Sequence, residues 1–479
     1  MYIKQNIDSF IRIYGEMGYI MNQMTYFDRL YNETGADFLS HITRKARKID
    51  DIVSELIQLY DESIDFNELK TEFRQFVVEL ERFMFVTTGT TPEEITQKEP
   101  IFSYGNNPKT KLRTFLQSFD EYEVEDTGEL LLQKSVVNPQ LSCVEFEITS
   151  RCNERCVHCY LPNERKDIGS DIELDSIIRV LDQAKQLNCL EVTISGGDPL
   201  LNKDLPAILT YAHKCDFKIT ILSNLVALTD AHIKLFKTLN IGLVQVSLYS
   251  MNEQEHDTIT KLMGSFRKTK ANIERLVASD IPVQISCPTM QGNYHSYKDV
   301  LAYAEQLQTK AQTDFVLMAK SDFTTENLEN RLTENQTKEL LKDILLFDKQ
   351  YTNDILCQTK KSENIDEYMQ RPLCGVGLGI ICVGSNGDVF PCAGWQGYVI
   401  GNIEYESLVD IWHNSEKLKF LRNVKVKDFP ECINCDSRDY CSICLVRNFN
   451  ENEGDMFKIN SSHCKAAKLN RQIVEESNN

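Results

Sequence analysis

Hydrophobic and polar positions alternate near the start of the chain and then change to a helical period. Two segments, Phe10-Ile-Arg-Ile-Tyr14 and Gly18-Tyr-Ile-Met21, roughly alternate apolar and polar residues around a glycine-containing turn, which predicts a β-hairpin. Apolar residues then recur at helical spacing, which predicts amphipathic helices over residues 33–42, 49–57 and 66–85. We therefore expect a small N-terminal domain over residues 1–100.

The next stretch, residues 101–140, shows no sustained period. It contains Asn106-Asn-Pro108 and scattered charges, which are typical of a loop. We expect a linker here with at most one helix.

From Cys143 onward, apolar runs alternate with helical patterns, which is typical of parallel β/α units. The expected strands cover residues 144–149, 191–195, 218–223, 243–248, 283–287 and 315–318. The expected helices between them cover residues 174–187, 205–213, 230–239, 266–279 and 297–308. This α/β pattern predicts a barrel-like domain over residues 141–345, with functional residues at the carboxyl ends of its strands.

The overall charge and hydropathy restrict the classes of partner that we expect this chain to bind. Lys and Arg number 52 and Asp and Glu 71, so the net charge is −19, and an acidic chain has no general attraction to nucleic acid or to an anionic membrane. We find no run of about twenty apolar residues and no signal peptide, so we expect a cytoplasmic protein. Cysteines in that compartment are reduced, and the clustered ones among the 16 in this chain therefore indicate metal ligands.

Three cysteines lie close together after the first strand of the expected barrel, at Cys152, Cys156 and Cys159. Three thiolates are one too few for a closed tetrahedral zinc site or a fully ligated four-iron cluster. They can hold three irons of a [4Fe-4S] cluster and leave the fourth iron open for a small ligand. The alternative is a structural zinc site that takes its fourth ligand from elsewhere, for example from His158.

This spacing, directly after Val144-Glu-Phe-Glu-Ile148, resembles the signature of the radical S-adenosylmethionine (SAM) enzymes. In that family the open iron chelates the amino and carboxylate groups of SAM. The reduced cluster cleaves SAM to methionine and a 5′-deoxyadenosyl radical. The six expected β/α units match the partial (β/α)6 barrel of the family, so the resemblance implies that fold for residues 141–345.

Further motifs at the strand ends fit the same resemblance. Ser195-Gly-Gly-Asp-Pro199 follows the second strand, where family members carry a Gly-Gly-Glu-Pro run that orients the amino group of SAM. Asp replaces Glu here, while the backbone contacts of the two glycines are expected to survive; taken alone, the run also fits an ordinary β-turn. The resemblance implies SAM contacts from Tyr160, Gly196, Gly197, Asp198, Ser223, Asn224 and Ser247.

A second set of cysteines lies in residues 346–479. Cys374 and Cys392 bracket an expected hairpin, and Cys432-x2-Cys435-x5-Cys441-x2-Cys444 and Cys464 follow. This order resembles the SPASM extension of radical SAM enzymes, although the last close pair is one residue shorter than in its commonest form. SPASM domains carry auxiliary [4Fe-4S] clusters, and two zinc ribbons are the alternative.

The resemblance implies one auxiliary cluster on Cys432, Cys435, Cys441 and Cys464 and another on Cys374, Cys392 and Cys444. The fourth ligand of the second cluster stays open. Cys382 is near in sequence, but we expect simple alternation across the hairpin to point it away from the face of Cys392. An iron without a protein ligand would be free to bind a substrate thiol.

The N-terminal pattern suggests a winged-helix-like plan. Three of its segments, Gly18–Asn22, Asn32–Leu39 and Ile49–Leu56, resemble the peptide-recognition element of enzymes that mature ribosomally made peptides, which has the fold of the pyrroloquinoline-quinone peptide chaperone. In that family a leader peptide adds a strand to the exposed sheet edge. DNA binding is disfavoured because the stretch is not conspicuously basic, and a plain packing domain is the other alternative.

Together these resemblances imply a radical SAM/SPASM maturase of a ribosomally made precursor peptide, supplied with electrons by an external donor. We expect a thioether crosslink first, and a carbon–carbon crosslink or another oxidation next. An enzyme of the anaerobic sulfatase-maturing type is disfavoured by the N-terminal domain, and a zinc-built binding module is the non-catalytic alternative. No general acid or base is assigned: for Glu145 and Glu147 we expect solvation or strand-edge pairing, and for His256–Thr260 and Gly264–Phe266 helix capping.

Overall fold

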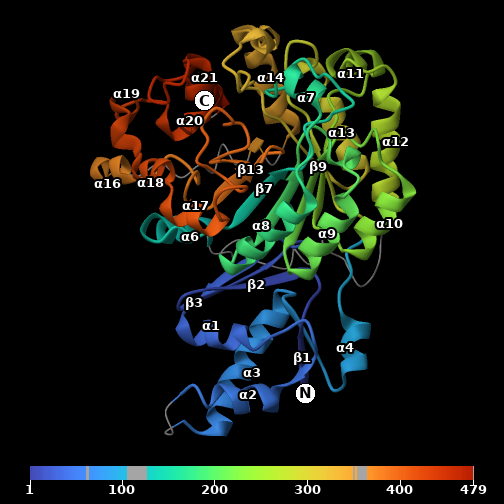
Figure 1. Ribbon diagram of the computed structural model, residues 1–479, viewed down its shortest axis with the longest axis vertical. Coiled ribbons are helices and arrows are strands. Elements are labelled where there is room, and N and C mark those ends of the chain that lie inside the picture. Colours follow the sequence, from blue (N-terminus) through green and yellow to red (C-terminus); the bar gives the residue numbers. More distant parts are fainter. Residues whose placement is uncertain (61–63, 105–126, 349–350, 353–363, 478–479) are drawn as a thin grey trace.

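The computed structural model describes residues 1–60, 64–104, 127–348, 351–352 and 364–477. Figure 1 shows three regions: the N-terminal domain in blue at the foot of the molecule, the barrel above it, and the orange and red C-terminal region beside the barrel. None of the described helices is long and apolar enough to cross a membrane.

The N-terminal domain contains the expected hairpin and the three expected helices. One antiparallel sheet has the order β2-β3-β4, and a second has the order β5-β1-β6. The second sheet was not expected, because β1 pairs with β6 across more than eighty residues, where local periodicity carries no signal. The bounds are β1 (Tyr2–Gln5), β2 (Ser9–Tyr14), β3 (Met17–Asn22), β4 (Asp28–Tyr31), β5 (Arg47–Lys48), β6 (Val86–Gly89), α1 (Glu33–Ser40), α2 (Ile49–Leu56), α3 (Phe66–Arg82) and α4 (Pro92–Lys98).

The barrel is formed by six parallel strands with helices outside them, as the alternating pattern predicts. The strands are β7 (Cys143–Glu147), β8 (Glu191–Ser195), β9 (Lys218–Ser223), β10 (Leu243–Ser247), β11 (Val283–Ser286) and β12 (Lys310–Gln312). The predicted helices are α8 (Leu174–Gln186), α9 (Leu205–Lys214), α10 (Asp230–Thr238), α12 (Ser265–Ala278) and α13 (Tyr297–Gln306). Two short helices, α7 (Asn163–Ile168) and α11 (Glu253–Thr260), were not expected, and α6 (Thr127–Val137) is the one described helix of the expected linker.

The sixth strand lies elsewhere than predicted. Residues 315–318 are not a strand; Lys310–Gln312 pairs with β11 instead. The apolar run at 315–318 follows the strand and connects the barrel to the C-terminal region, and the backbone oxygens of Leu317 and Met318 accept bonds from side chains of Arg331 and Asn327. The prediction failed because β12 is an edge strand with a polar residue at each end, so its sequence lacks the apolar run that indicates a buried strand.

The C-terminal region continues the barrel sheet. Its first strand, β13 (Ile380–Val383), pairs in parallel with β7, and β14 (Asp388–Phe390) and β15 (Gly401–Asn402) extend the sheet antiparallel. The remaining helices are α14 (Glu334–Phe347), α16 (Ile365–Gln370), α17 (Leu408–Asn414), α18 (Glu416–Asn423), α19 (Pro430–Ile433), α20 (Leu445–Glu451) and α21 (Ser461–Ser477). The sheet thus places the cysteine-rich region directly against the first barrel strand.

The β13–β14 hairpin sets the face on which Cys382 lies. Cys382 lies opposite Phe390, and residues directly opposite on antiparallel strands share one face. Cys392 lies two residues beyond the end of β14, where strand alternation assigns no face. The expected orientation of Cys382 relative to Cys392 therefore stays a prediction.

The N-terminal domain packs against the amino ends of the barrel strands. Arg12 donates to the backbone oxygen of Cys189 at 2.9 Å, and Arg44 pairs with Asp216 at 2.5 Å. Asn240 donates to Asp8 at 2.9 Å. These barrel residues directly precede β8, β9 and β10, so the domain lies at the end of the barrel opposite the carboxyl ends of the strands.

Candidate iron–sulfur and cofactor sites

The segment from Cys152 to Cys159, called the cysteine loop below, is held in place by α11. Arg155 N donates to Thr260 O at 2.9 Å and Val157 N to Ile259 O at 3.0 Å. The helix capping expected for residues 256–260 and 264–266 is present in part, because Asp257 accepts a hydrogen bond from Phe266 N at the start of α12. The backbone bonds of Ile259 and Thr260 show that α11 also fixes the shape of the cysteine loop.

The three thiols of the cysteine loop surround one buried cation. Burial lowers the pKa of Lys166, but the nearby thiolates of Cys159, Cys152 and Cys156 outweigh that effect and the pKa is raised overall. The loop therefore gathers its cysteines around one region at the carboxyl end of β7. Among the residues that the structure describes, no three His, Cys, Asp or Glu side chains converge closely enough to hold a single metal ion. Three cysteines at this place are the donor set of a [4Fe-4S] cluster with one open iron, as the resemblance implies.

The glycine pair after β8 forms a cradle that no side chain can enter. Gly196 has φ +130°, and a Cβ on it would lie 2.2 Å from Thr149 O. A Cβ on Gly197 would lie 2.1 Å from Arg151 O. Gly197 N donates to Thr149 O at 2.7 Å, so the two glycines pack directly against the backbone that leads into the cysteine loop. The two glycines therefore allow the end of β8 to pack closely against the start of the cysteine loop, and their contact with SAM stays what the resemblance implies.

The carboxylate of Asp198 is fully engaged by its own chain. It accepts bonds from Leu200 N at 2.9 Å, from Ser223 Oγ at 3.1 Å and from Asn224 N at 3.1 Å. Burial raises its pKa to about 6. Asp198 therefore ties the ends of β8 and β9 together and does not point a free oxygen into the site.

The predicted contacts from β9 and β10 lie beside the cysteine loop. Asn224 Nδ2 donates to Asn153 Oδ1 at 2.6 Å and lies 4.0 Å from Cys152 Sγ. The side chain of Ser247 bonds to Tyr249, whose hydroxyl lies 3.7 Å from Cys156 Sγ. The structure thus brings these strand ends and the loop into one site.

Tyr160, which directly follows the cysteine loop, reaches the end of β7 with its hydroxyl. Its hydroxyl donates to Glu147 Oε1 at 3.4 Å, and Gln396 Nε2 donates to Glu147 Oε2 at 2.5 Å. Arg165 completes the network by donating to Gln396 Oε1. The network therefore joins β7, the end of the cysteine loop and the C-terminal region.

A cavity of about 260 Å³ lies beside this network. Its lining comes from both the barrel and the C-terminal region and includes Glu147, Arg165, Lys166, Asn386 and Gln396. Burial raises the pKa of Glu147 to about 8. The expectation of solvation or strand-edge pairing is thus wrong for this residue: β7 is an interior strand, and its carboxyl faces a closed space.

Glu145, two residues earlier on the same strand, is half-buried. Its surroundings raise the pKa of its carboxyl to about 7, and a bond from Ser195 acts in the opposite direction. The strand-edge pairing expected for it is wrong, because β7 lies between β8 and β13, whereas its partial exposure agrees with the expected solvation.

The C-terminal cysteines fall into the two groups that the resemblance implies. Cys374, Cys392 and Cys444 interact electrostatically with one another. Cys432, Cys435 and Cys464 form a second mutually interacting group, and Tyr368 lies near both Cys432 and Cys441. The thiols within each group are thus close neighbours, which fits two separate clusters.

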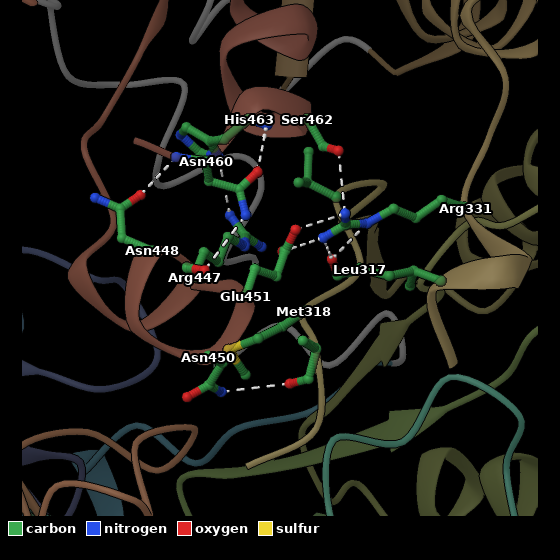
Figure 2. A network of polar contacts seen from close by, with 12 residues as sticks. Leu317, Met318, Arg331, Arg447, Asn448, Asn450, Glu451, Asn460, Ser462 and His463 are labelled. Carbon is green, nitrogen blue, oxygen red and sulfur yellow. Dashed lines mark hydrogen bonds and ion pairs between the residues drawn. The ribbon is translucent and has the colours of Figure 1, made fainter. Parts of the chain in front are cut away.

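Figure 2 shows a polar network that connects the segment of Leu317, Met318 and Arg331 to the C-terminal region. Arg331 pairs with Glu451 of α20 at 2.9 Å and donates to Ser462 Oγ at 3.0 Å and to Leu317 O at 3.0 Å. The segment that carries Arg331 also binds the cysteine loop, because Asn327 Nδ2 donates to His158 O at 3.2 Å.

Sequence reasoning missed several residues of these sites. Glu154 and Lys166 carry charge into the buried site, and Gln396 and Arg331 bridge the barrel and the C-terminal region. The position of Glu154 between two cysteines was the one available signal, because a carboxylate inside such a loop has no evident surface role. The bridging residues gave no signal, since their partners are more than one hundred residues away.

Comparison with protein families gives two matches. Residues 146–307 match the radical SAM superfamily, and residues 374–436 match the SPASM iron–sulfur cluster-binding domain. The first match runs from within β7 past β11 and includes the cysteine loop but not β12, and the second covers the β13–β14 hairpin and the first cysteines of the following run.

Two characterised relatives show different activities. An AdoMet-dependent heme synthase of Methanosarcina barkeri is 25% identical over 321 residues, which are 64% of this chain and 91% of that protein. The antilisterial bacteriocin subtilosin biosynthesis protein AlbA of Bacillus subtilis is 26% identical over 315 residues, which are 64% of this chain and 68% of that protein.

Solved structures share the fold. Streptococcus suis SuiB bound to its precursor peptide SuiA has a TM-score of 0.65 at 15% identity and covers 96% of this chain and 99% of its own. The enzyme anSMEcpe with bound AdoMet has a TM-score of 0.55 at 16% identity and covers 71% of this chain and 94% of its own. The cysteine spacing, the motifs at the strand ends and the fold therefore all agree with the two family matches.

Proposed function

Since this chain belongs to the radical SAM enzymes and carries a SPASM domain, we propose that it modifies a ribosomally made precursor peptide. The observation that carries this proposal is the whole-chain likeness to SuiB, which includes the N-terminal domain and extends over 96% of the chain. The SuiB structure holds a precursor peptide, and AlbA acts in the biosynthesis of a bacteriocin. These likenesses support a peptide substrate here.

The edge strand β4 is the docking place that we propose for a leader peptide. Asn22 N bonds to Phe27 O, and alternation along β3 and β4 then turns the N–H and C=O of Leu30 outward. Within the described ranges, no residue hydrogen-bonds to these two groups. The outward groups of β2 are partly engaged, since Asn188 donates to Ile13 O at 3.1 Å. An extended peptide can add to β4 as a further strand.

The core of the peptide would enter the cavity beside Glu147, at the other end of the barrel. The barrel strand β8 has five residues, which correspond to about 17 Å, so at least about five extended residues must separate the docked leader from the modified residue. Docking the leader raises the effective concentration of the core at the cavity.

Residues of this chain would hold the cofactors in the positions already described. We assign the SAM-binding [4Fe-4S] cluster to Cys152, Cys156 and Cys159, and the auxiliary clusters to the two C-terminal groups. When bound, these groups supply one-electron chemistry: reductive cleavage of SAM yields the radical that takes a hydrogen atom from the peptide, and an external donor supplies the electron.

Several side chains would support that chemistry. The Gly196–Gly197 cradle admits SAM close to the backbone. Gln396 and Tyr160 hold the carboxyl of Glu147 in place at the cavity. The buried surroundings keep water from the reacting carbon.

We propose a thioether between a cysteine sulfur and a peptide carbon as the product. Its formation removes two hydrogens: one would be transferred as an atom to the 5′-deoxyadenosyl radical and one would leave the thiol as a proton, while an auxiliary cluster would accept the remaining electron. A carbon–carbon crosslink removes two hydrogens as well but leaves thiols free. Mass analysis after thiol labelling therefore separates these products: a loss of two hydrogens without a free thiol supports the thioether, and retained thiols contradict it.

The test of the peptide substrate is co-expression with each small open reading frame that neighbours the gene, followed by mass analysis of the peptides. We expect one peptide to lose hydrogen, and Leu30→Pro to abolish the change by removing the outward N–H. Leu30→Ala keeps that N–H and serves as the control. An unmodified set of peptides, or a change that occurs on a tetrapyrrole instead, contradicts the proposal and favours the activity of the heme synthase relatives.

A further inference from the structure

Glu154 has a buried carboxylate oxygen that lacks a partner. The residue lies inside the cysteine loop and is only 2% exposed. Its Oε2 accepts a bond from Cys156 Sγ at 3.4 Å, whereas Oε1 has no hydrogen-bond partner among the described residues. Buried acceptors are paired in nearly all structures, so this oxygen is a place where a donor from a ligand or a water can bind.

The surroundings of Glu154 identify which ligand can bring this donor. Its carboxylate interacts with Cys156, Asp198, Asn224 and Lys166. Tyr249, which lies two residues after β10, also interacts electrostatically with Glu154. The amide nitrogen of Asn224 donates to Asn153 Oδ1, and Asn224 also lies close to the Glu154 carboxylate. Glu154 therefore faces the same space as the residues that the family resemblance assigns to SAM, and it presents an acceptor there.

The acceptor that relatives place after the glycine pair is missing at its usual position. Asp198 is one methylene shorter than Glu, it is completely buried, and it accepts bonds from Leu200 N, Asn224 N and Ser223 Oγ. Both of its oxygens are thus committed to the strand ends. The site retains backbone acceptors from the glycines, but Asp198 offers no free carboxylate oxygen to an incoming N–H group.

We propose that Glu154 accepts a hydrogen bond from the amino group of SAM and so replaces the carboxylate contact that Asp198 does not make. A carboxylate at this place also suits a cofactor that carries a sulfonium cation. The inference concerns SAM alone and does not depend on the peptide substrate.

The test measures SAM affinity by equilibrium dialysis of the anaerobically reconstituted enzyme. The variants are Glu154→Gln, Glu154→Asp and, as the control, Glu191→Gln, which changes a barrel carboxylate at the opposite strand end. Binding is counted per SAM-site cluster, from the EPR signal of the reduced protein. We expect Glu154→Gln to bind SAM about tenfold or more weakly and the control to bind as the wild type does.

Two analogues identify the group that Glu154 contacts. For an analogue that lacks the amino group, we expect Glu154→Gln and the wild type to bind equally well. For an analogue that lacks the ribose 2′-hydroxyl, we expect the full penalty of the substitution to remain. Equal SAM affinity of Glu154→Gln and wild type overturns the proposal, as does a penalty that disappears with the hydroxyl and not with the amino group.

Cluster content distinguishes binding from folding. We expect both Glu154 variants to retain the iron content of the wild type. Loss of iron in Glu154→Gln and Glu154→Asp alike, before SAM is added, would show that Glu154 serves the shape of the loop and would overturn the proposal. Failure of every peptide to react, with the affinity pattern intact, would refute the peptide substrate and leave this inference standing.

Discussion

Arg331 offers the sharpest test of how the cysteine loop is coupled to the C-terminal region. Arg331→Met keeps the length of the side chain and removes every bond that it makes to Glu451, Leu317 O and Ser462. The side chains of Arg331 and Glu451 are 16% and 15% exposed. Removing one partner of a buried ion pair costs about 3–5 kcal/mol, and the partial exposure favours the lower end, about 3 kcal/mol. That energy corresponds to a roughly hundredfold increase in local opening.

Hydrogen exchange measured by mass spectrometry reports this opening directly. We expect peptides from residues 313–331 and from α20 to exchange roughly a hundredfold faster in Arg331→Met. The matched control is Lys320→Met in the same segment, because its partner Glu326 is 80% exposed and such a pair contributes little. The double variant with Glu451→Met should recover part of the loss, since no unpaired charge stays buried.

The functional consequence follows from the bonds between this segment and the cysteine loop. Asn327 holds His158 O, and Ser321 N donates to Tyr160 O at 3.0 Å. Arg331→Met should therefore also reduce the iron retained after reconstitution. Exchange rates within threefold of the wild type, or equal to those of the Lys320→Met control, would show that the network does not couple the two regions.

Three further predictions concern the barrel. Burial raises the pKa of Glu147 from its ordinary value of 4.5 to about 8, so the folded state keeps a proton that the unfolded chain releases, and the wild type loses stability as pH rises from about 4.5 through 8. The urea midpoint of Glu147→Gln should therefore rise relative to that of the wild type over this pH window. A difference between the two midpoints that stays constant with pH would refute the assignment. Gly196→Ala should weaken SAM binding at least tenfold because its Cβ meets Thr149 O. Gly292→Ala, whose Cβ would lie 3.9 Å from its nearest neighbour, should leave SAM binding unchanged. Equal SAM affinities of the two variants in a dialysis assay would contradict the role of Gly196 in the site. Alanine at all three positions of the cysteine loop should remove about four irons per chain and all SAM cleavage, and undiminished iron would contradict the ligand assignment.

Local patterns predicted most of the barrel because its strands are buried on both faces. The ends of β8 and β9 agree with the expected bounds, since apolar runs there begin and end sharply. The sixth strand was misplaced because Lys310–Gln312 has two polar ends, while the apolar run after it packs outside the sheet. The pairing of β1 with β6 depends on contacts distant in sequence, so no window of the chain contains its signal.

The motifs predicted where the sites lie, but not how each side chain points. Spacing placed Gly196 and the cysteine loop at neighbouring strand ends, as the structure shows. It did not reveal that Asp198 turns inward or that Glu154 is left with a free oxygen, because both depend on Ser223 and Asn224 from another strand. The face of the sheet on which Cys382 lies likewise depends on the register of the β13–β14 hairpin, which local sequence patterns do not give.

The measurement that tests the central claim most directly combines metal analysis with product detection. The protein is purified and reconstituted without oxygen, its iron and sulfide are counted, and it is incubated with dithionite and SAM. The account predicts roughly twelve irons per chain, in three clusters of four, and release of 5′-deoxyadenosine. Zinc in place of iron, with SAM intact, would contradict it and leave only a peptide-binding scaffold.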